Sequence, residues 1–263
     1  VYAPWRDSEF LSVFGGRKEM IDYCQSHNLP ITATHDKPYS TDANILGLTH
    51  EAGELEDLQT STSRIQPGMG VFPSDAPDEA EYIELEFISG DCVSVNGKTK
   101  NPAEVMRTLN AIAGKHGVGR VDIVENRYVG IKSRGVYETP GGTILLKAHR
   151  AMESITLDRE EVFTKDELMP KYARLVYNGY WFAPERIMMQ KAIDATQKRV
   201  NGQVKLALYK GNVIVIGRQS PNSLYDEDLA TFESSNYDQR DAEGFIKLNA
   251  LRLRIAANRG RKL

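Results

Sequence analysis

GVGRVDIVENRYVGIKSRGVYETPGGT, residues 117–143, combines the pattern of a β-strand with a run of hydrogen-bonding side chains. Val121, Ile123 and Val124 follow a glycine turn and predict an extended segment. Alternate side chains of a strand point to opposite faces, so Glu125 continues the face that Val121 and Ile123 make apolar. A carboxylate in that position needs a cationic or hydrogen-bonding partner.

Two interpretations of Glu125 are open. The first is an internal ion pair with Arg127 or Arg134. The second is a contact with the ammonium group of a small ligand. Glycines around this carboxylate allow the backbone to come close to such a molecule; they are Gly130, Gly135, Gly141 and Gly142.

The composition is that of an ordinary globular protein. Of 263 residues, 41% are hydrophobic and 26% are charged, and the formal net charge is −3. This balance argues against a general nucleic-acid surface. No apolar run approaches the roughly 20 residues of a membrane helix, and the five histidines lack metal-binding spacing. We therefore expect no nucleic-acid partner, no membrane span and no metal site. Two distant cysteines predict reduced thiols in the cytoplasm.

The first 34 residues predict a strand, a helix and a strand, at 1–4, 14–27 and 31–34. This order is typical of the closing unit of a parallel α/β sheet, and we expect the other strands of that sheet to precede Val1. Residues 58–80 predict a long loop because they are rich in Pro, Gly, Ser, Thr and Asp.

Further along, the patterns alternate between strands and helices. We predict antiparallel strands within 82–98, a helix from Asn101-Pro102, a helix near Thr143, a helix from Pro184 to about 201, a hairpin at 204–218 and a helix at about 245–258. The buried face of the first helix is expected to carry Val105, Met106, Leu109 and Ile112. These elements indicate an α+β protein.

Two local motifs each have two interpretations. Residues 114–119 (GKHGVG) resemble a phosphate loop, but they follow a helix, which favours a glycine-rich helix stop. Ser40-Thr41-Asp42 has the form of a helix N-cap before residues 43–46. That cap does not explain why Thr49 follows with His50 and Glu51.

The C-terminal helix carries two apolar stripes. Ile246, Ala250, Leu253 and Ala257 form one, and Leu248, Leu251 and Ile255 form the other. Two stripes need two surfaces, so we expect an arm that packs on another subunit. The alternative is a helix wedged between two parts of its own chain.

Several long blocks resemble argininosuccinate synthase. They are the opening APWR, YSTDANILGLTHEAGELED, GKHGVGRVDIVENRYVGIKSRGVYETPGGT, LVYNGYWFAPE, IGRQSPNSLY and GFIKLNALRLR. The resemblance covers essentially the whole chain. It implies a cytoplasmic ligase of arginine biosynthesis that joins citrulline and aspartate and converts ATP, accompanied by Mg, to AMP and pyrophosphate. It also implies a homotetramer held through the C-terminal helix.

The resemblance implies a citrulline site at four positions. Ser40 and Thr49 match a hydroxyl pair, Glu125 matches the glutamate of VENR, and Tyr137 matches the tyrosine of GxYETP. Thr49 stands where some family members have serine. No catalytic residue is implied, because the ureido oxygen of citrulline attacks the α-phosphorus of ATP, and the aspartate amine then displaces AMP.

The family's ATP signature, an SGGxDT loop, does not occur in this sequence, and neither does its GKGND segment. We therefore expect residues 1–34 to end a nucleotide-binding domain, 35–225 to form a synthetase domain and 226–263 to form the arm. The chain alone is expected to be inactive. The rival hypothesis is a non-catalytic module that binds citrulline or supports assembly.

Overall fold

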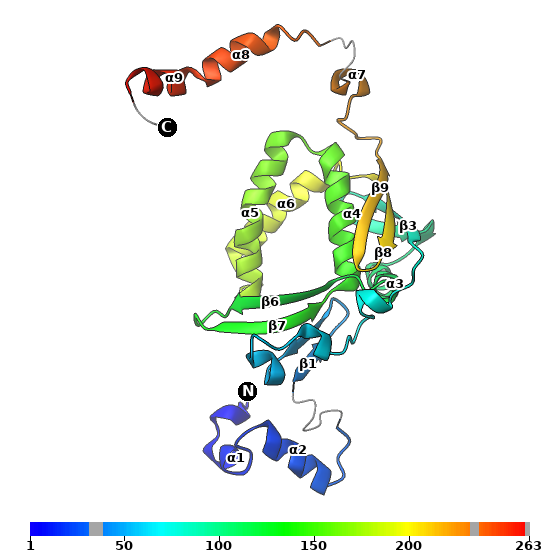
Figure 1. Ribbon diagram of the computed structural model, residues 1–263, viewed down its shortest axis with the longest axis vertical. Coiled ribbons are helices and arrows are strands. Elements are labelled where there is room, and N and C mark those ends of the chain that lie inside the picture. The colour runs from blue at the N-terminus through cyan, green and yellow to red at the C-terminus, as the bar shows by residue number, and fades with distance from the viewer. Residues whose placement is uncertain (32–38, 232–236, 261–263) are drawn as a thin grey trace. The chain divides into compact units, whose positions relative to one another are not determined.

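The computed structural model describes residues 1–31, 39–231 and 237–260. The chain divides into two compact units, Val1–Asn222 and Ser223–Leu263, which are described separately below (Figure 1). Across the described residues the elements are nine α-helices and two antiparallel sheets. The predicted α+β class is confirmed.

The N-terminal residues form three short helical segments. They are η1 (Pro4–Arg6), α1 (Ser8–Val13) and α2 (Arg17–Ser26). The predicted helix at 14–27 is confirmed as α2. The predicted strand at 1–4 is wrong, because Pro4 begins a 3₁₀ turn and the Asp7 carboxylate then caps α1 by accepting from the Glu9 and Phe10 amides. The strand expected at 31–34 lies almost wholly outside the described residues.

A four-stranded antiparallel sheet has the order β1-β2-β7-β6. Its strands are β1 (Ser40–Ala43), β2 (Leu48–Glu51), β6 (Arg120–Asn126) and β7 (Lys132–Glu138). The N-cap interpretation of Ser40-Thr41-Asp42 is wrong. These residues form a hairpin with β2, closed by a hydrogen bond from the Asn44 amide to the Gly47 carbonyl. Pairing with a strand that is itself paired to β7 outweighs the local capping preference.

The long loop predicted at residues 58–80 is confirmed, and the whole connection from β2 to β3 contains only short 3₁₀ turns. They are η2 (Gly53–Glu56), η3 (Thr62–Arg64) and η4 (Pro73–Asp75). Leu55 and Ile65 from this loop pack with Val136 against one face of the four-stranded sheet.

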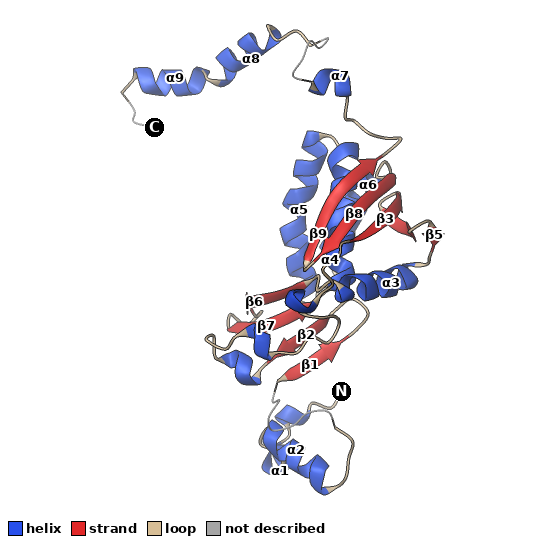
Figure 2. Ribbon diagram, turned by 45° about the vertical axis from the view of Figure 1, so that its right-hand side comes forward, coloured by secondary structure: helices blue, strands red, loops and turns tan. Residues whose placement is uncertain are grey.

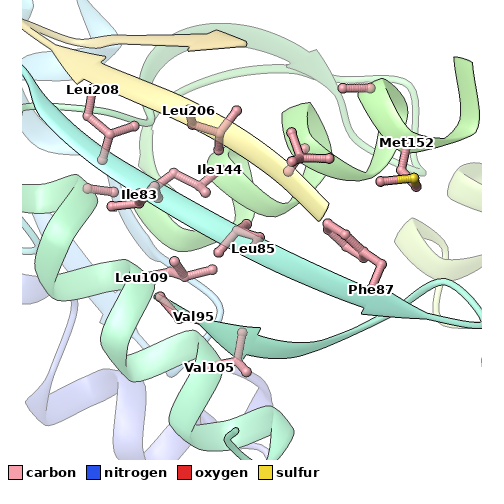
Figure 3. Packing of buried hydrophobic residues seen from close by; sticks show 14 of the residues in the cluster. Ile83, Leu85, Phe87, Val95, Val105, Leu109, Ile144, Met152, Leu206 and Leu208 are labelled. Atoms are coloured by element: carbon pink, nitrogen blue, oxygen red, sulfur yellow. The ribbon is translucent and has the colours of Figure 1, made fainter. Parts of the chain in front are cut away.

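A five-stranded antiparallel sheet of order β5-β4-β3-β8-β9 forms the main core with two helices (Figure 2). The strands are β3 (Glu81–Ile88), β4 (Asp91–Val95), β5 (Lys98–Thr99), β8 (Gly202–Tyr209) and β9 (Asn212–Gln219). Lys210 and Gly211 both have positive φ, as a two-residue hairpin turn requires. Leu85 and Leu206 meet Leu109 and Ile144 between sheet and helices (Figure 3).

The helix predicted from Asn101-Pro102 is α3 (Pro102–Lys115). Asn101 and Glu104 form a capping box, in which each side chain accepts from the other residue's amide. Val105 and Leu109 are buried as expected, whereas Met106 and Ile112 are only half-buried. The glycines after this helix support its stop, since Gly117 and Gly119 have positive φ.

Three further helices complete the first unit: α4 (Pro140–Thr156), α5 (Arg159–Tyr177) and α6 (Pro184–Gln197). Both α4 and α6 were predicted. Helix α5 was not predicted. It contains Pro170 in its interior, and proline usually ends or kinks a helix.

The second unit consists of α7 (Glu227–Ala230), α8 (Asp241–Asn249) and α9 (Leu251–Asn258). The single helix expected at about 245–258 is therefore wrong, because two helices meet at Ala250. None of the helices formed by the described residues combines the length and apolar character that a bilayer crossing requires.

Candidate functional site

The opening stretch of the sequence folds into the β6–β7 hairpin and leads into α4. Val121 and Ile123 are indeed on one face with Glu125, but they are 47% and 43% exposed. The apolar face that the sequence predicts is therefore present, but it is partly exposed to solvent. We call this side of the four-stranded sheet the open face; it carries Ser40, Thr49, Glu125 and Tyr137.

Strand register brings the four predicted residues onto this one face. Thr49 on β2 is paired with Tyr137 on β7, and directly opposed residues have neighbouring side chains. Ser40 is paired with Glu51, which is paired with Gly135. Glu125 follows two residues beyond Ile123, the β6 partner of Gly135. Ser40 thus lies at the β1 edge, and Glu125 lies at the β6 edge of the same surface.

Gly135 allows Tyr137 to reach Glu125. The Tyr137 ring lies over Gly135, and a Cβ atom at that glycine would come within 2.9 Å of Tyr137 Cε2. Because that space is free, the Tyr137 hydroxyl extends along the sheet and donates a hydrogen bond to Glu125 Oε1. Gly135 therefore makes room for the Tyr137 side chain.

The Glu125 carboxylate accepts hydrogen bonds from two tyrosines. Tyr137 donates to Oε1, and Tyr177, at the end of α5, donates to Oε2. The hydroxyl of Tyr137, and next that of Tyr177, holds the pKa of Glu125 below its ordinary value, although burial opposes this. The charge of Arg127 contributes less. Glu125 is thus a carboxylate at neutral pH.

The arginines proposed as internal partners of Glu125 are paired with other acids. Arg134 donates to Asp122 at 2.8 Å, on the opposite face of the sheet. Arg127 donates to Glu51 at 3.2 Å and to Ser133 at 3.1 Å. The first interpretation of Glu125, a direct ion pair with one of these arginines, is therefore wrong.

Tyr137 remains a hydrogen-bond donor throughout the neutral range. Burial, and then the hydrogen bond to Glu125, raises the pKa of its hydroxyl. At the other edge, the Ser40 hydroxyl accepts from Arg17 of α2. Ser40, Thr49, Glu125 and Tyr137 are all partly exposed, so each can be reached from solvent.

The opposite face of the sheet is fixed by a buried carboxylate. Glu138 accepts from His50 Nε2 at 2.9 Å, Arg120 Nη1 at 2.7 Å and the Met69 amide at 2.7 Å. A further hydrogen bond comes from the Gly68 amide at 3.0 Å. These contacts tie β2, β6, β7 and the long loop together. One face of the sheet thus carries a buried network around Glu138, whereas the residues of the open face are partly exposed.

Within residues 1–31, 39–231 and 237–260, no three His, Cys, Asp or Glu side chains are placed to hold a metal ion. A cavity of about 610 Å³ lies between α3, α4 and β4, and none of the four predicted site residues lines it.

Sequence reasoning missed Tyr177. It lies 52 residues from Glu125, on a helix that was not predicted. Its only signal was its position in the block LVYNGYWFAPE, where nothing distinguishes it from the other aromatic residues.

The fold and this surface define an α+β protein in which neighbouring antiparallel strands present carboxylate and hydroxyl groups on one open face. Residues 39–256 match the family model described as the arginosuccinate synthase C-terminal domain. The chain belongs to the argininosuccinate synthase family.

Similar proteins carry the same family name. The chain is 58% identical over 267 residues to an argininosuccinate synthase of Pseudomonas putida, with all of this chain and 65% of that protein covered. It is 57% identical over 268 residues to one of Saccharophagus degradans, covering all of this chain and 64% of the relative. The chain thus spans about 65% of the length of the relatives that it matches.

Proposed function

We propose that the chain supplies the citrulline-binding part of an argininosuccinate synthase, a cytoplasmic ligase that joins citrulline and aspartate at the expense of ATP. The observation that carries the proposal is the Glu125 carboxylate, held in its charged form on the open face by two tyrosine hydroxyls. In this proposal residues 35–225 form the synthetase domain, and residues 1–34 belong to the nucleotide-binding domain.

The open face offers groups that complement citrulline. The ligand carries an ammonium, a carboxylate and a neutral ureido group. Glu125 accepts from the ammonium, since a carboxylate has about four acceptor positions and the tyrosines occupy two. The Thr49 and Ser40 hydroxyls lie further across the sheet and donate to the oxygens of the ligand. The Tyr137 ring provides an apolar wall beside them.

These residues contribute by orientation. The reaction joins three substrates, and the attacking atom in the first step is the ureido oxygen of citrulline. Holding the amino-acid end of citrulline fixes the direction of that oxygen, which lowers the entropic part of the barrier. No side chain of the open face is needed as a nucleophile. ATP, with its Mg, is bound mainly by the SGGxDT segment that the family resemblance implies.

The proposal predicts that this chain alone makes no argininosuccinate. Joining it to the part of the Pseudomonas putida relative that this chain does not cover should give product from ATP, citrulline and aspartate; we call the joined protein the complete enzyme. Product is measured by chromatography. The variant Glu125→Gln of the complete enzyme is assayed in the same way, and its matched control is Asp122→Asn, which removes a carboxylate on the opposite face of the sheet. Product from the chain alone would refute our assignment of the ATP site. A complete enzyme that binds citrulline and ATP without forming product would favour the rival non-catalytic module.

We also propose that residues 226–263, which lie within the second compact unit, form an arm that packs on another subunit of a homotetramer. Neither α8 nor α9 has a buried residue, although both carry large apolar side chains; these are Phe245, Ile246, Leu248, Leu251, Leu253 and Ile255. Burying three such side chains contributes on the order of 5 kcal/mol, which is enough to affect assembly.

Deletion of residues 244–263 is therefore expected to convert a tetramer into smaller species in sedimentation velocity. The matched control is Lys247→Gln with Arg254→Gln, which changes the charge of the two helices and keeps every apolar side chain. A truncated protein that sediments like the intact oligomer would contradict the arm and favour packing of the helix within its own chain.

A further inference from the structure

We propose that Tyr177 is a positioning residue of the citrulline site, whose hydroxyl fixes the Glu125 carboxylate for the ligand ammonium. This inference rests on the proposed function. It adds a residue from α5 to a site whose four predicted members all lie on the four-stranded sheet.

The two tyrosines hold different oxygens of the same carboxylate. Tyr137 donates to Oε1 from within the sheet, and Tyr177 donates to Oε2 from above it. A glutamate side chain held at one oxygen can still rotate about that contact. A second donor at the other oxygen removes this freedom before the ligand arrives. Pre-organisation of this kind improves affinity because less conformational entropy is lost on binding.

The position of Tyr177 is set by how α5 ends. Gly179 has a positive φ of 83°, and the Tyr180 amide donates to the Leu175 carbonyl at 2.9 Å, so the helix stops at Tyr177. The adjacent Tyr180 hydroxyl lies 3.2 Å from that of Tyr128, beyond the end of β6. The end of α5 therefore contacts the β6–β7 hairpin through two tyrosines, and Figure 1 shows this end of α5 beside β6.

Helix α5 is itself anchored in the first unit. Lys165 is buried, and its Nζ lies 3.3 Å from Oε1 of the equally buried Glu153 on α4. Next to it, Arg150 of α4 donates to Asp166 at 2.7 Å. On the other side, Tyr172 donates to Gln190 of α6 at 2.5 Å. These contacts fix α5 against α4 and α6. The position of the Tyr177 hydroxyl at the end of α5 is therefore fixed as well.

Tyr177 has little to contribute to the core, because it is 54% exposed. Tyr180, three residues later, is 45% exposed and gives a matched control. Both have a hydrogen-bonded hydroxyl, but only that of Tyr177 contacts Glu125. Removing either hydroxyl leaves the ring in place, so a difference between the two variants reports on Glu125.

The test is Tyr177→Phe against Tyr180→Phe in the complete enzyme, with Glu125→Gln measured beside them. Tyr177→Phe is expected to raise the KM for citrulline about 2- to 12-fold, as loss of one hydrogen bond implies, with kcat and Tm nearly unchanged. Tyr180→Phe should leave KM unchanged.

The pH profile gives a readout that a structural role would not move. The charged and titratable groups around Glu125 are Tyr137, Tyr177, Arg127 and Glu51. Without the Tyr177 hydroxyl, the pKa of Glu125 rises towards its ordinary value, so the acid limb of citrulline binding should move to higher pH. Tyr180→Phe should leave that limb in place.

The outcomes separate the two proposals. Weaker citrulline binding in Glu125→Gln with no change in Tyr177→Phe would overturn the role of Tyr177 and leave the proposed function standing. A lower Tm for Tyr177→Phe with unchanged KM and pH profile would show a structural role and also overturn it. Unchanged binding in Glu125→Gln would refute the proposed function itself.

Discussion

Glu125→Gln is expected to weaken citrulline binding by the complete enzyme about 10- to 150-fold and to change ATP binding much less. The amide keeps the size of the side chain and removes its charge. A hydrogen bond to a charged group typically contributes about 1.5–3 kcal/mol, and each 1.4 kcal/mol is a factor of ten in affinity. Isothermal titration calorimetry with citrulline and, separately, with ATP measures both effects.

Ser40→Ala is the graded comparison for this variant. A neutral hydroxyl contributes less than a charged carboxylate, so it should weaken citrulline in the same direction but by a smaller factor. Because Ser40 lies in β1 and caps no helix, this substitution should not lower helix stability. If Glu125→Gln leaves citrulline affinity unchanged and lowers only the free energy of unfolding, then Glu125 has an internal structural role.

Citrulline binding should also show the ionisation of Glu125. The pKa of this carboxyl is depressed in the folded protein, chiefly by the hydrogen bond from Tyr137. Affinity is therefore expected to be constant above the ordinary glutamate pKa and to fall only as pH drops through the depressed value. In Glu125→Gln that acid limb should disappear.

Glu138→Gln is expected to lower the free energy of unfolding by about 3–5 kcal/mol, the cost of breaking a buried charge pair. Glu138 is 3% exposed and accepts from His50, Arg120 and two backbone amides. An amide presents one oxygen and an NH₂ group, so it cannot serve all these donors. The partly buried guanidinium of Arg120 would then lose its carboxylate partner. Urea unfolding measures the loss.

The contribution of Glu138 to stability should depend on pH because of the same contacts. Burial opposes the ionisation of Glu138, but its hydrogen bonds from His50, Met69 and Gly68 and the charge of Arg120 prevail and lower the pKa. The stabilisation is therefore complete above the ordinary glutamate pKa and is lost as pH falls through the depressed folded value. In Glu138→Gln this dependence should be absent.

Glu84→Gln is the matched control for Glu138→Gln. Glu84 lies on β3 and pairs with Lys205 at 3.6 Å near the surface, where both side chains are at least partly exposed and ion pairs contribute about 0–1 kcal/mol. If both variants unfold at the same urea concentration, the buried network around Glu138 does not hold the sheet together.

Much of the fold could be predicted because its signals are local. The cap at Asn101, the turn at Lys210-Gly211 and the spacing of Val105 and Leu109 each lie within one element, and the structure confirms them. The errors arose where distant pairing decides. Ser40-Thr41-Asp42 has a capping sequence but pairs with β2 as a strand.

In the candidate site too, local features could be predicted from the sequence, and features that depend on distant parts of the chain could not. Glu125 was noticeable in the sequence because a carboxylate follows apolar residues of a strand, and alternation placed it on the correct face. The clustering of Ser40, Thr49 and Tyr137 depends on the register of three strands, which the residues alone do not reveal; the family resemblance indicated it. Tyr177 depends on where an unpredicted helix ends, so no local pattern pointed to it.

A crystal structure of the complete enzyme with citrulline tests the central claim most directly. We expect the ligand on the open face, with its ammonium nitrogen about 2.7–2.9 Å from a carboxylate oxygen of Glu125 and the Tyr137 and Tyr177 hydroxyls still on that carboxylate. Citrulline bound away from the open face, or bound there with its ammonium turned from Glu125, would contradict the account.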